Sequence, residues 1–263
     1  MAADRAEPAD RGFYVYGIVG TERPELTGVT GVDGRSAVFM LDEDGLGAIV
    51  SEVPLAEFGE DALRRNLEEL SWVAEKVRAH EDVLERAARE APVVPLRFGT
   101  IYRSLDGLRE LLTQDRGQLA TTLEELRGKR EWGVTSVIDR ERLSQAVHAS
   151  DPRAAQLAEA AEGKPTGTAY LGRKRLERHL GARADELATR LTVTAHDRLT
   201  AVAHRAVREG STQLKGAYLV EEARDGEFRR VLEELGREYE PFGIRFELTG
   251  PWPPYSFVGE RTG

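Results

Sequence analysis

One long apolar stripe constrains the fold of this chain more than any other feature. Apolar side chains recur every three or four positions at Leu176, Leu180, Ala184, Leu187, Leu191, Ala195, Leu199, Val202 and Ala206. This spacing predicts one amphipathic helix over residues 170–208. At 1.5 Å per residue, such a helix would span roughly 58 Å, which is longer than a small domain is wide.

Strand-like and shorter helical patterns flank this helix. Strands are predicted at 13–19, 36–41, 46–53, 93–102, 131–139, 213–222 and 244–248, and helices at 61–91, 105–112, 118–127, 141–149 and 228–239. Asp42 to Gly45 predicts a hairpin loop, and residues 150–167 predict a loop around a short helical piece. Pro95 predicts an edge strand or a strand that begins at the proline. These patterns predict an α+β protein with helices on one face of each sheet.

The length and the position of the glycines predict two domains. A chain of 263 residues is long enough for two cores. We predict a flexible charged leader at 1–11, an N-terminal α+β domain at 12–128 and a C-terminal α+β domain at 129–263. The boundary falls near Gly128, where charge and glycine cluster, and the C-terminal domain holds the long helix and the tail.

The tail is the run FELTGPWPPYSFV at residues 246–258. Its prolines end any regular strand ladder because proline has no N–H to donate. Trp252, Tyr255 and Phe257 place three aromatic rings on this stiff segment. Two interpretations stay open for them: packing onto a domain core, or an aromatic surface that binds a partner protein.

Composition excludes several classes of function. The net charge of −9 argues against binding to nucleic acid or to anionic membranes. The absence of cysteine excludes disulfides, thiolate catalysis, cysteine zinc sites and iron–sulfur clusters. No run of about 18 apolar residues and no secretory signal is present, so we expect a cytoplasmic protein.

The sequence predicts no catalytic, metal-binding or cofactor-binding residues. Gly163 to Thr166 resembles a phosphate loop superficially, but the spacing is wrong and Pro165 removes a donor. His80 flanks the apolar stripe of the 61–91 helix, and Arg97 lies on the strand expected to pack against it. We interpret His80 and Arg97 as a structural polar pair. The alternative is a small-ligand or enzymatic α+β domain that exposes both side chains in a concave pocket.

Five blocks of sequence together resemble one known family. They are FYVYGIV at 13–19, HEDVL at 80–84 leading to VPLRFGTIY at 94–102, EWGVTSVID at 131–139, LKGAYLV at 214–220, and the tail run. In this order they resemble the gas vesicle protein F/L family (GvpF/GvpL) over nearly the whole chain. The RFGT and GPWPPYSFV segments are the specific ones.

The resemblance implies both a fold and a role. It implies a modified ferredoxin-like C-terminal domain and a non-enzymatic accessory or minor structural protein of gas vesicles. The implied partners are the small hydrophobic shell protein, GvpA, and other vesicle accessory proteins, and the implied location is the gas vesicle in the cytoplasm. The long helix and the tail are then the candidate contact elements. Neither F-type nor L-type membership follows from the sequence.

Overall fold

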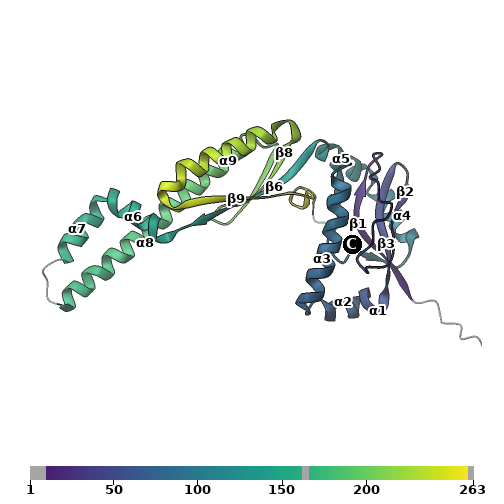
Figure 1. Ribbon diagram of the computed structural model, residues 1–263, viewed down its shortest axis with the longest axis horizontal. Helices are drawn as coiled ribbons and strands as arrows, with labels where there is room; N and C mark the ends of the chain where they lie inside the picture. The colour runs from purple at the N-terminus through teal and green to yellow at the C-terminus, as the bar shows by residue number, and fades with distance from the viewer. Residues whose placement is uncertain (1–9, 162–165, 260–263) are drawn as a thin grey trace, which may run out of the picture. The chain divides into compact units, whose positions relative to one another are not determined.

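The computed structural model describes residues 10–161 and 166–259 (Figure 1). Residues 1–9 of the expected leader and Gly163 to Pro165 of the expected loop lie outside these residues. The chain divides into two compact units. The first contains the described residues up to Lys129 together with those from Trp252 onward, and the second contains Arg130–Pro251. The second unit is therefore inserted between two segments of the first.

The first unit is built on an antiparallel sheet. Its strands are β1 (Arg11–Val19), β2 (Val38–Glu43), β3 (Leu46–Pro54), β4 (Val93–Pro95) and β5 (Ile101–Tyr102). The order is β2-β3-β1-β4, and β5 also pairs with β1. The sequence prediction of a central strand at 13–19 is therefore confirmed, as is the edge position of the strand that contains Pro95.

The hairpin between β2 and β3 turns through two residues. Glu43 pairs with Leu46, so Asp44 and Gly45 alone form the loop. Their φ angles are +46° and +86°. Two consecutive residues with positive φ suit the right-handed twist of the strands, and this is why an Asp-Gly pair is favoured here. The hairpin predicted from the sequence is confirmed.

Five helices accompany this sheet. They are α1 (Leu55–Phe58), α2 (Glu60–Asn66), α3 (Leu70–Ala88), α4 (Leu105–Gln114) and α5 (Arg116–Leu126). The Ser104 side chain caps α4 by accepting a hydrogen bond from the Gly107 N–H.

The single helix predicted at 61–91 is wrong. Leu67 ends α2, and α3 begins only at Leu70, so the leucine spacing runs across a break between two helices. Both leucines are exposed as a result. The face of α3 that is buried instead carries Lys76, His80, Val83, Leu84 and Ala87.

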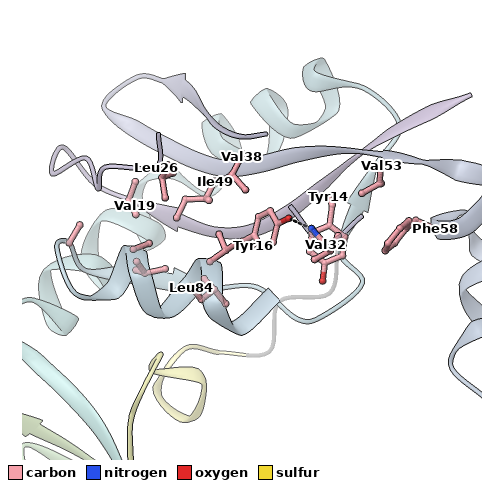
Figure 2. Close-up of a cluster of buried hydrophobic side chains, with 14 residues drawn as sticks. Tyr14, Tyr16, Val19, Leu26, Val32, Val38, Ile49, Val53, Phe58 and Leu84 are labelled. Atoms are coloured by element: carbon pink, nitrogen blue, oxygen red, sulfur yellow. Dashed lines mark hydrogen bonds between the residues drawn. The ribbon is translucent and has the colours of Figure 1, made fainter. Parts of the chain in front are cut away.

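The core of the first unit lies between the sheet and α3. Figure 2 shows Tyr14 and Tyr16 of β1 and Leu84 of α3 in this layer, with the dashed hydrogen bond from the Val32 N–H to the Tyr16 hydroxyl. Consecutive residues of β3 are buried, which requires cover on both faces of the sheet. The sheet of this unit is therefore covered on both faces.

The second unit is a four-stranded sheet with helices. Its strands are β6 (Lys129–Ile138), β7 (Arg205–Glu209), β8 (Lys215–Glu221) and β9 (Ile244–Trp252), in the order β7-β8-β6-β9. Its helices are α6 (Arg140–Ser150), α7 (Pro152–Ala161), α8 (Thr166–Thr200) and α9 (Asp225–Tyr239), with 3-10 turns at Glu222–Arg224 and Glu240–Phe242. The elements follow the order β-α-β-β-α-β, with α6 to α8 in the first helical position. The ferredoxin-like assignment itself stays a prediction.

The longest helix is shorter than its stripe. α8 ends at Thr200, and residues 205–209 form strand β7. Ala206 continues the stripe only because alternate residues of β7 turn toward the protein. In Figure 1, α7 lies beside the first half of α8 at the end of this unit away from its sheet. No helix among the described residues is both long and apolar enough to cross a membrane.

Candidate functional site

A chain of hydrogen bonds centred on His80 lies inside the first unit. The His80 side chain is buried on α3. Its Nδ1 lies 3.0 Å from the Tyr14 hydroxyl, and its Nε2 lies 2.9 Å from the Tyr255 hydroxyl. The Tyr255 hydroxyl in turn donates to Glu81 Oε1 over 3.0 Å. At the other end, the Gly99 N–H donates to the Tyr14 hydroxyl over 3.0 Å.

At neutral pH the hydrogen bonds of this network follow one another from donor to acceptor in a single direction. Burial lowers the pKa of His80 to about 4, so the ring is neutral and carries one proton. Ionised Glu81 can only accept, and Tyr255 therefore uses its proton on that carboxylate. In this arrangement Tyr255 accepts from Nε2–H and Nδ1 accepts from Tyr14, while a hydrogen bond to the Leu96 backbone partly opposes the lowering of the His80 pKa. Every hydroxyl and ring nitrogen in the chain has a partner.

Aromatic rings enclose the imidazole. The Tyr16 ring stacks on His80 at 5.6 Å between centroids, and the Tyr14 and Phe98 rings meet it edge-on at 5.7 and 5.8 Å. Burial raises the pKa of Tyr16 to about 12 and raises the pKa of Tyr14 as well, so both hydroxyls stay protonated. The Tyr16 hydroxyl is held by Ser51 at 2.8 Å. This cage fixes the ring and keeps it dry.

Burial also acts on the carboxylate at the end of the chain. Glu81 is partly buried, and desolvation raises its pKa, while the hydrogen bond from Tyr255 opposes that shift. Removing the hydroxyl of Tyr255 would therefore leave Nε2 and the Glu81 carboxylate without this shared partner. We interpret the network as a clamp that holds the tail on α3.

His80 and Arg97, which were predicted to form a structural polar pair, lie in different environments, and their pairing stays a prediction. The ring nitrogens of His80 face Tyr14 and Tyr255, whereas Arg97 is exposed. A buried, fully hydrogen-bonded imidazole does not suit the alternative of a catalytic or small-ligand site, which required both side chains to line a pocket. The geometry thus favours a structural role for His80.

The three tail aromatics lie in different environments. Phe257 is buried, Tyr255 is half-buried in the His80 network, and the Trp252 side chain is 42% exposed. The sequence predicted this tail as part of the C-terminal domain, but its residues from Trp252 onward belong to the first unit. Tyr255 packs against the core of that unit as well as bonding to His80.

Two members of the network were missed from the sequence. Tyr14 was assigned only to a strand, and Glu81 was assigned no role of its own. Tyr14 itself was a signal of the network in the sequence, because a tyrosine on a buried strand needs a hydrogen-bond partner for its hydroxyl. The network joins three of the sequence blocks described above: FYVYGIV, the HEDVL to RFGT region, and GPWPPYSFV.

Histidines elsewhere also have hydrogen-bond partners. The ring of His196 bonds to the Tyr218 hydroxyl at 2.8 Å, and His179 bonds to Asp151 at 2.8 Å. Across residues 10–161 and 166–259, no cluster of His, Asp or Glu has the makings of a metal site.

Comparison with known proteins identifies the family. A family model described as gas vesicle synthesis protein GvpL/GvpF matches residues 12–259. Gas vesicle protein L of Streptomyces sp. (strain CB03234) is 34% identical over 267 residues, covering 95% of this chain and 94% of that protein. Gas vesicle protein F1 of Halobacterium salinarum is 27% identical over 254 residues, covering 95% of this chain and 94% of that protein.

A solved structure has the same fold. The crystal structure of GvpF from Anabaena sp. PCC7120 superposes with a TM-score of 0.70 at 24% identity, covering 95% of this chain and 99% of that one. The fold and the match along the chain agree with the order of the five sequence blocks. This chain therefore belongs to the GvpL/GvpF family of gas vesicle synthesis proteins.

Proposed function

We propose that this protein assists gas vesicle assembly by binding the hydrophobic shell protein and other vesicle accessory proteins, without catalysing a reaction. Membership of the GvpL/GvpF family supports an accessory role in gas vesicles, and with it a location at the vesicle. The saturated hydrogen bonding of buried His80 supports a non-enzymatic role, because no proton acceptor there is open to a substrate.

The exposed indole of Trp252 carries the proposal for the contact surface. Trp252 stands at the end of β9, directly before the buried Pro253 and Pro254 and the anchored Tyr255. Large aromatic side chains on a rigid base are the residues that contribute most to protein interfaces. The His80 clamp holds the backbone beside Trp252 in place, so little ordering is needed when a partner binds.

The proposed mechanism is the shielding of apolar surface. A shell subunit exposes apolar surface before it enters the vesicle wall, and such surface aggregates in water. A carrier with a net charge of −9 and an aromatic contact point can cover that surface and keep the complex dispersed. Release into the growing wall then returns the carrier for another subunit.

A capture experiment tests the role of Trp252. Tagged protein is mixed with freshly translated shell protein, and bound shell protein is measured for wild type, Trp252→Ala and Val207→Ala. Val207 is a matched control because it is an apolar residue outside the tail and is 40% exposed, close to the 42% of Trp252. We expect Trp252→Ala to lose capture by about tenfold or more, as for a central interface aromatic. Val207→Ala should retain it.

Equal capture by all three proteins would remove Trp252 from the contact. Failure of wild type itself to bind shell protein would contradict the carrier role. A role as a permanent wall component makes a different prediction, since the protein would then remain with intact vesicles after extensive washing.

A further inference from the structure

Two small surfaces of this protein combine exposed apolar side chains with charges that form no ion pair among the described residues. The first, which we name the arm patch, lies on the first turns of α8 and consists of Tyr170, Leu171, Lys174, Arg175 and Arg178. Tyr170 and Leu171 are 53% and 59% exposed. Each of the two is followed four residues later by a cation, so apolar and basic groups share one helical face.

Two basic residues further along α8 form ion pairs, whereas the cations of the arm patch do not. Arg183 pairs with Asp151, and Arg198 pairs with Glu238. Within the described part of the chain, Lys174, Arg175 and Arg178 form no ion pair. Lys174 only lies over the Tyr170 ring, at 5.9 Å from its centroid. The arm patch thus carries uncompensated positive charge on a protein whose net charge is −9.

The second surface, the junction patch, lies where α2 ends and α3 begins. It consists of Leu67, Glu68, Glu69 and Leu70. The two leucines are 47% and 84% exposed. Neither carboxylate forms an ion pair among the described residues, and Glu69 accepts only a long hydrogen bond from Ser71. This patch is the acidic counterpart of the arm patch, because each presents two large apolar groups beside unpaired charge.

We propose that the arm patch of one copy docks onto the junction patch of a second copy. Charge complementarity and matched apolar pairs favour this occupant. An anionic membrane or a nucleic acid would fit the arm patch alone, but the acidic remainder of the protein would repel it. The contact joins two different surfaces, so it can repeat from copy to copy into a ring or a row.

The proposed contact is independent of the shell-protein contact at Trp252. It would line up several carriers. The two ideas fail separately: loss of self-association need not alter capture of shell protein, and Trp252→Ala need not alter self-association.

Charge reversal tests the contact. The arm variant carries Arg175→Glu and Arg178→Glu, and the junction variant carries Glu68→Lys and Glu69→Lys. Sedimentation velocity over a range of concentrations should show that wild type self-associates, and that added salt weakens the association because exposed charges are screened. Each variant alone should associate at least about tenfold more weakly, because like charges then face each other.

Mixing the two variants gives the decisive result. The reversed arm of the first variant complements the reversed junction of the second, and the unchanged patches also complement each other. An equimolar mixture should therefore recover association at the wild-type level. A control with Arg237→Glu and Arg245→Glu makes the same change in net charge on exposed residues outside both patches, and should associate like wild type.

Three outcomes would overturn the proposal. Wild type could remain a monomer at every concentration and at low salt. The reversed variants could associate as well as wild type, or their mixture could fail to recover. A monomer whose arm patch captures an acidic peptide would assign that patch to another protein instead of a second copy. Circular dichroism of each variant excludes misfolding as the cause of a loss.

Discussion

At the scale of single residues, the buried imidazole of His80 links the stability of the first unit to pH. Burial holds its pKa near 4, whereas the unfolded chain binds a proton near pH 6.5. Above pH 6.5 both states are unprotonated and the network is intact. As the pH falls from 6.5 to 4, only the unfolded state gains the proton, so the stability of the fold declines. Glu81 acts in the opposite sense because its pKa is raised.

The substitution His80→Gln tests this linkage. We expect wild type to lose up to ~3 kcal/mol of unfolding free energy through His80 between pH 6.5 and 4. The variant should be less stable at pH 7, because a buried partner of Tyr14 is lost, and its stability should vary less with pH. Urea unfolding at a series of pH values, followed by tryptophan fluorescence, measures both. His148→Gln, at an exposed histidine of α6, should keep the wild-type slope. An unchanged slope in His80→Gln would show that His80 does not set it.

At the scale of elements, two glycines show how the backbone requirement of a turn differs from that of a helix. Gly45 has φ +86° in the β2–β3 hairpin, and a Cβ added there would meet no atom within 4 Å. Any cost of substitution is therefore backbone strain alone. Gly181 lies inside α8, also with no atom within 4 Å of an added Cβ and without a positive φ. Both sites have room for a side chain. Gly45 needs a positive φ, which favours glycine, whereas Gly181 has the ordinary helical backbone, which favours alanine.

Alanine at these two glycines should change stability in opposite directions. Gly45→Ala should destabilise the first unit by about 1–2 kcal/mol, because an alanine pays the left-handed penalty. Gly181→Ala should stabilise α8 by about 1 kcal/mol, because alanine is the better helix former. Thermal unfolding of the two variants measures both effects. Equal shifts of the same sign would show that local backbone preference does not control these elements.

The elements that could be predicted from the sequence are those with a local cause. The hairpin follows from Asp44 and Gly45, the α4 start from Ser104, and the edge strand from Pro95. Errors arose where a spacing continued through a change of structure, as at Leu67 in the first unit and at Ala206 in the second. The spacing of apolar residues in the sequence can continue across the end of a helix. It therefore does not show where one element stops and the next begins.

At the scale of the whole molecule, the tail contact joins residues 175 positions apart in the sequence, His80 and Tyr255. No local pattern could predict this pairing, since periodicity reports only on neighbours along one element. His80 and Tyr255 were both identified as candidates from the sequence, but for separate roles. Their meeting depends on the tail leaving the second unit after Pro251.

Removing one hydroxyl should loosen that connection. Tyr255→Phe leaves Nε2 of His80 and the Glu81 carboxylate without their shared partner, and we expect a loss of about 1–3 kcal/mol in the first unit. Hydrogen exchange should speed up in peptides covering α3 and residues 252–257, while peptides of the second unit keep their rates. Tyr170→Phe, at an exposed tyrosine, should change neither. Faster exchange confined to the second unit would contradict this assignment of the tail.

The insertion of the second unit within the first also determines the order in which the protein can be completed. A ribosome releases the sheet and α3 of the first unit, then the entire second unit, and only afterwards the segment that supplies Tyr255 and Phe257. Until residues 252–257 have been synthesised, one side of the core of the first unit is therefore uncovered. That interval exposes apolar surface on a nascent chain, which is where chaperones act. Residues 252–257 thus complete the unit that was begun first.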